Sequence, residues 1–175
     1  MINKQTGIFS EDELYYNVSN AMYTPYEERE LKIKNYIYQK LYSGDEVGVW
    51  GKDNHIVISF RDKINIFNDY KTILQLKLQL IINTNRFKDN LKQVKEVISR
   101  YKNYNITFCG IGLGARLAIE MLFVYPQYNS IIFHINYFSP RRYKGLNIRC
   151  YLNFISDLPI ITIDCYKECV YLISS

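Results

Sequence analysis

The chain has 175 residues, of which 48% are hydrophobic and 22% charged. This length and composition fit a single folded domain and exclude an intrinsically disordered chain. Lysine and arginine outnumber aspartate and glutamate by 22 to 17, and the net charge of +5 is too small and too dispersed to indicate a nucleic-acid partner. No apolar run reaches the roughly 18 residues of a transmembrane helix, and residues 1–14 lack the pattern of a signal peptide. We therefore expect a soluble, intracellular protein that is not transmembrane.

The few cysteines and histidines do not form a metal-binding pattern. Cys109, Cys150, Cys165 and Cys169 contain no C-x-x-C spacing, so neither a zinc site nor a disulfide framework is predicted. A reducing compartment such as the cytoplasm is the simpler expectation, with no metal and no cofactor. Residues with A/T-rich codons number 83, which is typical of the A/T-rich genomes of many large DNA viruses, some protists and low-GC bacteria. For a viral chain the virion is the alternative location.

Residues 1–45 predict an N-terminal helical segment that packs on the main body. Ser10 and Glu13 form a capping box, so a helix should start at Ser10. Pro25 stands at a position favoured in the first helical turn, and a second helix should end near residue 44. The apolar side chains that define this second helix recur every four residues: Ile33, Ile37 and Leu41.

Residues 46–175 predict an α/β domain. Segments 46–51 and 55–60 flank a polar turn and should form a β-hairpin. Helices are expected at 66–80, 86–102 and 113–125, and strands at 106–109, 130–138, 148–155, 160–165 and 170–173. Strands that are apolar on both faces and alternate with helices indicate a mainly parallel sheet, which the initial antiparallel hairpin would make mixed. The helix from Leu113 is apolar nearly all round and should be buried.

The glycine-rich turn between the strand at 106–109 and the following helix supports two interpretations. As a dinucleotide fingerprint, Gly110-x-Gly112-x-x-Ala115 would hold a pyrophosphate on backbone amides. The next strand offers no acidic residue for a ribose hydroxyl, which weakens this interpretation. As a nucleophile elbow, G-x-S-x-G, the turn would lift the side chain of residue 112 above the sheet, but that residue is glycine.

Several stretches resemble the class 3 (fungal-type) lipase family, in the family's own order, from about residue 46 to the C-terminus. Residues 57–63 (VISFRDK) look like its V-x-x-F-R-G-T/S strand, and residues 106–118 are similar to its T-G-H-S-L-G-G-A-L-A elbow. Residues 137–141 (YFSPR) resemble its F-G-S-P-R turn, and residues 153–159 (NFISDLP) resemble its N-x-x-D-x-V-P segment. The resemblance implies a reduced α/β-hydrolase fold with flanking helices.

The resemblance also implies a catalytic site, and this sequence has lost most of it. The family's chemistry needs a serine nucleophile, a histidine base, an acid and two backbone amides for the oxyanion. Gly112 stands at the nucleophile position, Asp157 stands at the acid position, and no histidine follows Asp157. At the oxyanion positions the amide of Leu113 remains, whereas Asp62 replaces a glycine and its carboxylate would oppose a developing oxyanion. No intact catalytic residue is expected.

The favoured interpretation is a catalytically inactive lipase-like domain, retained to bind another protein or to assemble with itself. Seventeen tyrosines favour a protein interface. Three alternatives stay open: a working hydrolase that uses Cys165 or Ser139, a protein that binds a lipid or acyl chain, and a dinucleotide-binding protein. Asp157 without a histidine is expected to cap or pair with Arg141 or Arg142. Cys109 is expected to be a buried small hydrophobic residue, and His55 and His134 are expected to be core or surface histidines and not relocated bases.

Overall fold

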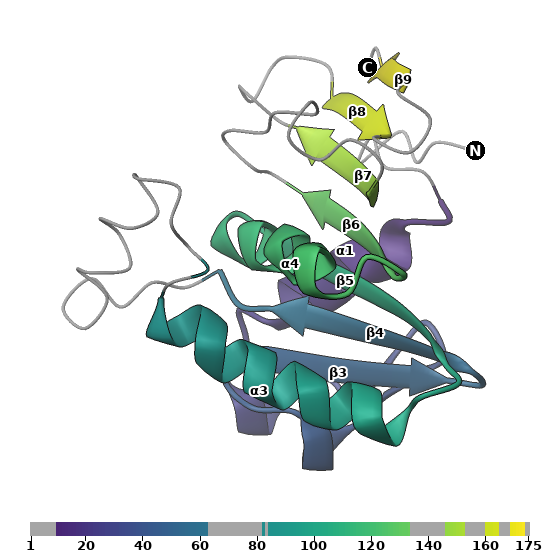
Figure 1. The fold of residues 1–175 in the computed structure, drawn as a ribbon. Helices are drawn as coiled ribbons and strands as arrows, with labels where there is room; N and C mark the ends of the chain where they lie inside the picture. The colour runs from purple at the N-terminus through teal and green to yellow at the C-terminus, as the bar shows by residue number, and fades with distance from the viewer. Residues whose placement is uncertain are drawn as a thin grey trace, which may run out of the picture.

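The computed structural model describes residues 10–62, 82, 84–133, 146–152, 160–164 and 169–173. In these residues the strands of a nine-stranded sheet lie in chain order, from β1 to β9. Figure 1 shows this order for β3 to β9. The four strands at its centre pair in parallel: β4 (His55–Phe60), β5 (Asn105–Ile111), β6 (Asn129–Phe133) and β7 (Asn147–Leu152). The strands on both sides of this centre pair antiparallel. The α/β class is confirmed, and the sheet is mixed, with its parallel part in the middle.

The expected hairpin is present as β3 (Val47–Lys52) and β4, which pair antiparallel along their whole length. Asp53 has a φ of 51° in the turn between them. The expected strands at 130, 148, 160 and 170 are also confirmed as β6, β7, β8 (Ile160–Asp164) and β9 (Cys169–Ile173). The helix expected at 66–80 lies outside the described residues.

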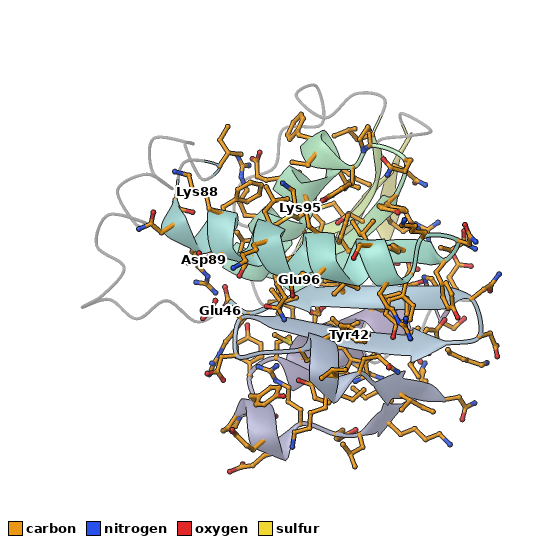
Figure 2. The ribbon with its side chains drawn as sticks, turned by 60° about the horizontal axis from the view of Figure 1, so that its bottom comes forward. Tyr42, Glu46, Lys88, Asp89, Lys95 and Glu96 are labelled. Carbon is orange, nitrogen blue, oxygen red and sulfur yellow. The ribbon has the colours of Figure 1, made fainter. Side chains whose placement is uncertain are left out.

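Two helices cover one face of the sheet and a third covers the other (Figure 1). α3 (Asn85–Arg100) and α4 (Leu113–Val124) pack on the first face, and both confirm the sequence prediction. Thr84 caps α3 by accepting a hydrogen bond from the Phe87 amide at 3.0 Å. Figure 2 shows the charged side chains of α3 on its outer face, among them the exposed Lys88, Asp89, Lys95 and Glu96. The opposite side of α3 buries Phe87, Val94 and Val97.

The third helix, α1 (Glu13–Ala21), begins three residues later than the capping box predicted. Asp12 is its N-cap residue, but its carboxylate does not cap the helix. It accepts hydrogen bonds from Arg149 at 2.7 Å and from the Tyr151 hydroxyl at 2.6 Å, both on β7. The capping-box prediction for Ser10 is therefore wrong, because a tertiary contact with β7 engages the acidic side chain that precedes the helix.

The expected second helix is also wrong. Residues 24–44 form two short 3-10 turns, η1 (Tyr26–Glu28) and η2 (Lys40–Tyr42), and between them lie β1 (Lys32–Ile33) and β2 (Tyr36–Tyr38). The two residues between these strands both have positive φ, 44° and 74°, as a tight hairpin requires. Because β2 pairs with β3, the segment adds two strands to the sheet. The period-four residues do not share a face: Ile33 is buried, whereas Ile37 and Leu41 are exposed.

In the described part of the chain, the helices are too short or too polar to cross a lipid bilayer.

Candidate functional site: the turn at Gly112

The sharp turn between β5 and α4 depends on an unusual backbone conformation. Gly112 has φ 56° and ψ −117° and stands at the N-cap of α4. For a residue with a side chain, such a conformation is strained by roughly 1 to 3 kcal/mol, whereas glycine adopts it freely. The Gly112 amide donates a hydrogen bond to the Phe133 carbonyl oxygen on β6 at 3.2 Å. This strand-turn-helix geometry is the one in which hydrolases of the elbow type present their nucleophile.

The flanking glycines are required by close packing. A Cβ atom added to Gly110 would lie 2.3 Å from the carbonyl carbon of Gly114. A Cβ atom added to Gly114 would lie 2.1 Å from the Phe60 carbonyl oxygen at the end of β4. Both positions therefore exclude any larger residue, which accounts physically for glycine two residues before and two residues after position 112.

A carboxylate occupies the space directly above this turn. Asp62 Oδ1 accepts a hydrogen bond from the Leu113 backbone amide at 2.6 Å. A Cβ atom at position 112 would lie 2.3 Å from the same oxygen. The carboxylate of Asp62 therefore fills the space that a side chain at position 112 would need. It also accepts the hydrogen bond of the Leu113 amide, the group that the family resemblance predicted as an oxyanion donor.

Tyr23 holds the other oxygen of this carboxylate. Its hydroxyl donates to Asp62 Oδ2 at 2.9 Å, from the chain that follows α1. Burial and the contact with Asp62 raise the pKa of Tyr23, so the phenol keeps its proton and remains a donor. Sequence analysis missed Tyr23, because the two residues are 39 positions apart and no local pattern connects them.

Most of the other predicted site residues cannot be compared with this turn. Asp157, Ser139, Cys165 and His134 all lie outside the described residues, as do Arg141 and Arg142. Cys109 is buried as expected, and burial raises the pKa of its thiol to about 11. A thiol in that state is a poor nucleophile, because the thiolate is the reactive form.

His55 lies at the other end of the parallel strands. It is in register with Asn105 at the start of β5, and Gly112 follows seven residues later, roughly 20 Å away along an extended strand. Its Nδ1 lies 2.7 Å from the Tyr36 hydroxyl and its Nε2 lies 2.9 Å from Thr107 Oγ1. Burial lowers the pKa of His55. It is a structural histidine and cannot reach the turn as a base.

The turn is also poorly suited to a phosphate or a metal ion. The negative charge of Asp62 stands against the Leu113 amide, where a pyrophosphate would have to bind in a dinucleotide-binding turn. Among the described residues, no three histidine, cysteine, aspartate or glutamate side chains come together as a cation site.

The chain matches neither a model of a known protein family nor a curated protein sequence.

Proposed function

We propose that this chain is a catalytically inactive, lipase-like domain of the reduced α/β-hydrolase type, retained to bind another protein or to assemble with itself. The observation that carries the proposal is the hydrogen bond from the Leu113 amide to Asp62, directly above Gly112. Two separate steps of ester hydrolysis are blocked by this arrangement.

The first blocked step is nucleophilic attack. Glycine has no side-chain atom that could attack a carbonyl carbon and form an acyl-enzyme. A serine placed at position 112 would collide with the Asp62 carboxylate, because its Cβ alone would lie 2.3 Å from Oδ1. Loss of the nucleophile and occupation of its space therefore go together.

The second blocked step is stabilisation of the oxyanion. Hydrolases place backbone N–H donors where negative charge develops in the transition state. Here the corresponding donor, the Leu113 amide, already binds a carboxylate that Tyr23 holds in place. A developing oxyanion would meet a negative charge instead of a free donor, and its energy would rise.

A binding role is supported by exposed apolar side chains around the β1–β2 hairpin and at the end of α4. Leu31, Ile37 and Leu41, around the β1–β2 hairpin, are 68%, 58% and 86% exposed. Phe123 and Val124 at the end of α4 are 47% and 42% exposed. Exposed apolar side chains are a feature of protein interaction surfaces where they form a contiguous patch.

The catalytic half of the proposal is tested with p-nitrophenyl esters of increasing acyl length and with fluorophosphonate labelling read by intact mass. We expect neither turnover nor an adduct for the wild type, for Gly112→Ser, or for Gly112→Ser combined with Asp62→Gly, which removes the carboxylate. An active lipase serves as positive control. Turnover or an adduct in the wild type would overturn the proposal, and its loss in Cys165→Ser or Ser139→Ala would identify the nucleophile of a working hydrolase.

The binding half is tested by light scattering of the purified chain over a concentration series. Self-association that is weakened by Leu41→Lys, and unchanged by Asp89→Lys at an exposed position of α3, would support assembly through the β1–β2 side. A monomer at all concentrations would direct the search to a different protein. Lipids that co-purify with the chain, read by mass spectrometry, would instead favour the lipid-binding alternative.

A further inference from the structure

An open pocket of about 440 Å³ lies where the parallel strands begin, at the end of the sheet opposite Gly112. Its volume falls in the range of small-molecule sites, roughly 300 to 1,000 Å³. The strands β5, β6 and β7 all begin with asparagine, and because parallel strands start at the same edge, these three residues lie along one edge of the sheet. Asn105, Asn129 and Asn147 all line the pocket. Other lining side chains are Tyr15, His55, Thr107, Gln127 and Tyr128.

A chain of hydrogen bonds fixes the floor of this pocket. The Thr107 hydroxyl donates to Asn129 Oδ1 at 3.0 Å, so its oxygen is left to accept from His55 Nε2 at 2.9 Å. His55 Nδ1 must then accept from the Tyr36 hydroxyl, which lies 2.7 Å away. This pattern requires a neutral imidazole, in agreement with the lowered pKa of His55. With its carbonyl oxygen held, Asn129 keeps its amide NH₂ group as a donor for a ligand.

Three further amide side chains are available. Within the described residues, those of Asn105, Gln127 and Asn147 make no hydrogen bond to another protein group. Each offers two donor hydrogens and one acceptor oxygen. An apolar ligand would leave these amides buried and unpaired, which is costly. The pocket therefore suits a ligand that carries several hydrogen-bonding groups of its own.

The described lining contains no aspartate, glutamate, lysine or arginine. It thus provides no ion pair for a phosphate, a carboxylate or an amine, which favours a neutral ligand. The rings of Tyr15 and Tyr128 supply apolar faces beside the amides. A ligand with adjacent hydroxyl groups and a C–H face would use both features.

We propose that this pocket is a binding site for a neutral sugar, whose hydroxyls pair with the asparagine and glutamine amides and whose C–H face packs on a tyrosine ring. The site lies away from the turn at Gly112 and does not depend on whether that turn is inactive.

The test is saturation-transfer NMR and calorimetry on the full chain. The probes are glucose, mannose, galactose and N-acetylglucosamine, with adenosine, uridine and inorganic phosphate as comparison ligands. We expect at least one sugar to receive saturation and to bind with measurable heat at millimolar concentration. Asn129→Ala should weaken that binding about tenfold, since it removes the oriented amide.

Two further variants separate a binding effect from a folding effect. Gln127→Ala should weaken sugar binding while leaving the melting temperature unchanged, because this exposed side chain makes no hydrogen bond to described protein groups. Asn103→Ala, at an exposed position outside the pocket, should bind the sugar as the wild type does. The proposal is overturned by an absence of sugar binding, by a nucleoside or phosphate binding in place of the sugars, or by sugar binding that neither pocket variant weakens.

Discussion

The Asp62 carboxylate caps the first amide of helix α4 from 51 residues away in the chain, through its 2.6 Å hydrogen bond with Leu113. A helix is commonly capped by a Ser, Thr, Asp or Asn side chain at its own N-cap position. Gly112, at the N-cap position of α4, has no side chain that could do this. The Leu113 amide instead donates its hydrogen bond to Asp62, two residues after the end of β4. One contact thus caps the helix and occupies the amide beside Gly112.

Asp62→Ala should lower the free energy of unfolding by about 1 to 2 kcal/mol, because it leaves the Leu113 amide and the Tyr23 hydroxyl without their acceptor. Urea unfolding followed by circular dichroism measures the change. Tyr23→Phe removes one hydroxyl and should cost less. Asp89→Ala, at an exposed position on α3, is the control and should change stability by less than about 0.5 kcal/mol. Equal effects of Asp62→Ala and Asp89→Ala would contradict the capping role.

Gly112→Ala should destabilise the protein by about 1 to 3 kcal/mol from backbone strain, with a further cost from the collision with Asp62. Since the collision needs the carboxylate, the cost of Gly112→Ala should be smaller in an Asp62→Ala background. A double-mutant cycle measures this coupling. Strictly additive effects would show that the two positions are energetically independent. Gly44→Ala is the matched control, because its new methyl would meet neighbours no closer than 3.7 Å.

Arg149→Met should cost about 2 to 3 kcal/mol. The Asp12 side chain is only 3% exposed and would lose its cationic partner while staying buried, with the Tyr151 hydroxyl still bound. The loss should fall below that of a fully buried pair because the Arg149 side chain is 27% exposed. Chemical denaturation measures the change, and adding Asp12→Asn should recover part of it. Lys34→Met, which breaks a more exposed ion pair with Glu13, should cost under about 1 kcal/mol.

The pH dependence of stability should carry a contribution from His55. Burial lowers its pKa in the folded state below the ordinary value of 6.5, so the unfolded chain takes up a proton first as the pH falls. Its contribution to stability is complete above pH 6.5 and is lost as the pH falls from there through the lowered pKa. His55→Gln should therefore flatten the stability curve below pH 6.5. A curve that keeps its slope in the variant would assign the pH dependence to other groups.

Some parts of the fold could be predicted because their signals are local. The apolar spacing of α3, the apolar sequence of α4 and the polar turn between β3 and β4 each act over a few residues, and all three elements are present. The β1–β2 hairpin could not be predicted in the same way. Its turn residues, Lys34 and Asn35, lack the glycine that marks such turns, and a period-four spacing imitated a helix.

In the candidate site, too, the features with a local sequence signal could be predicted and the others could not. A sharp turn at Gly112 could be expected from the glycine-rich motif. In the structure, close packing accounts for the glycines at positions 110 and 114, and a positive φ accounts for the glycine at position 112. The sequence resemblance predicted a shared site for Asp62 and Leu113, and the two residues are joined by a hydrogen bond; the catalytic meaning of that site stays a prediction. Its direct bond to that amide, and the part of Tyr23, depend on how the end of β4, the start of α4 and the chain after α1 meet in space. No short sequence pattern carries that information.

The order of strands in the sheet has a consequence for how the protein is made. Since each of the described strands pairs with its described neighbour in the chain, each can add to the growing sheet soon after it leaves the ribosome. The contact between Asp12 and Arg149 is different, because it spans 137 residues and closes only after β7 has been synthesised. During translation the start of α1 therefore gains this contact only after Arg149 has been added to the chain.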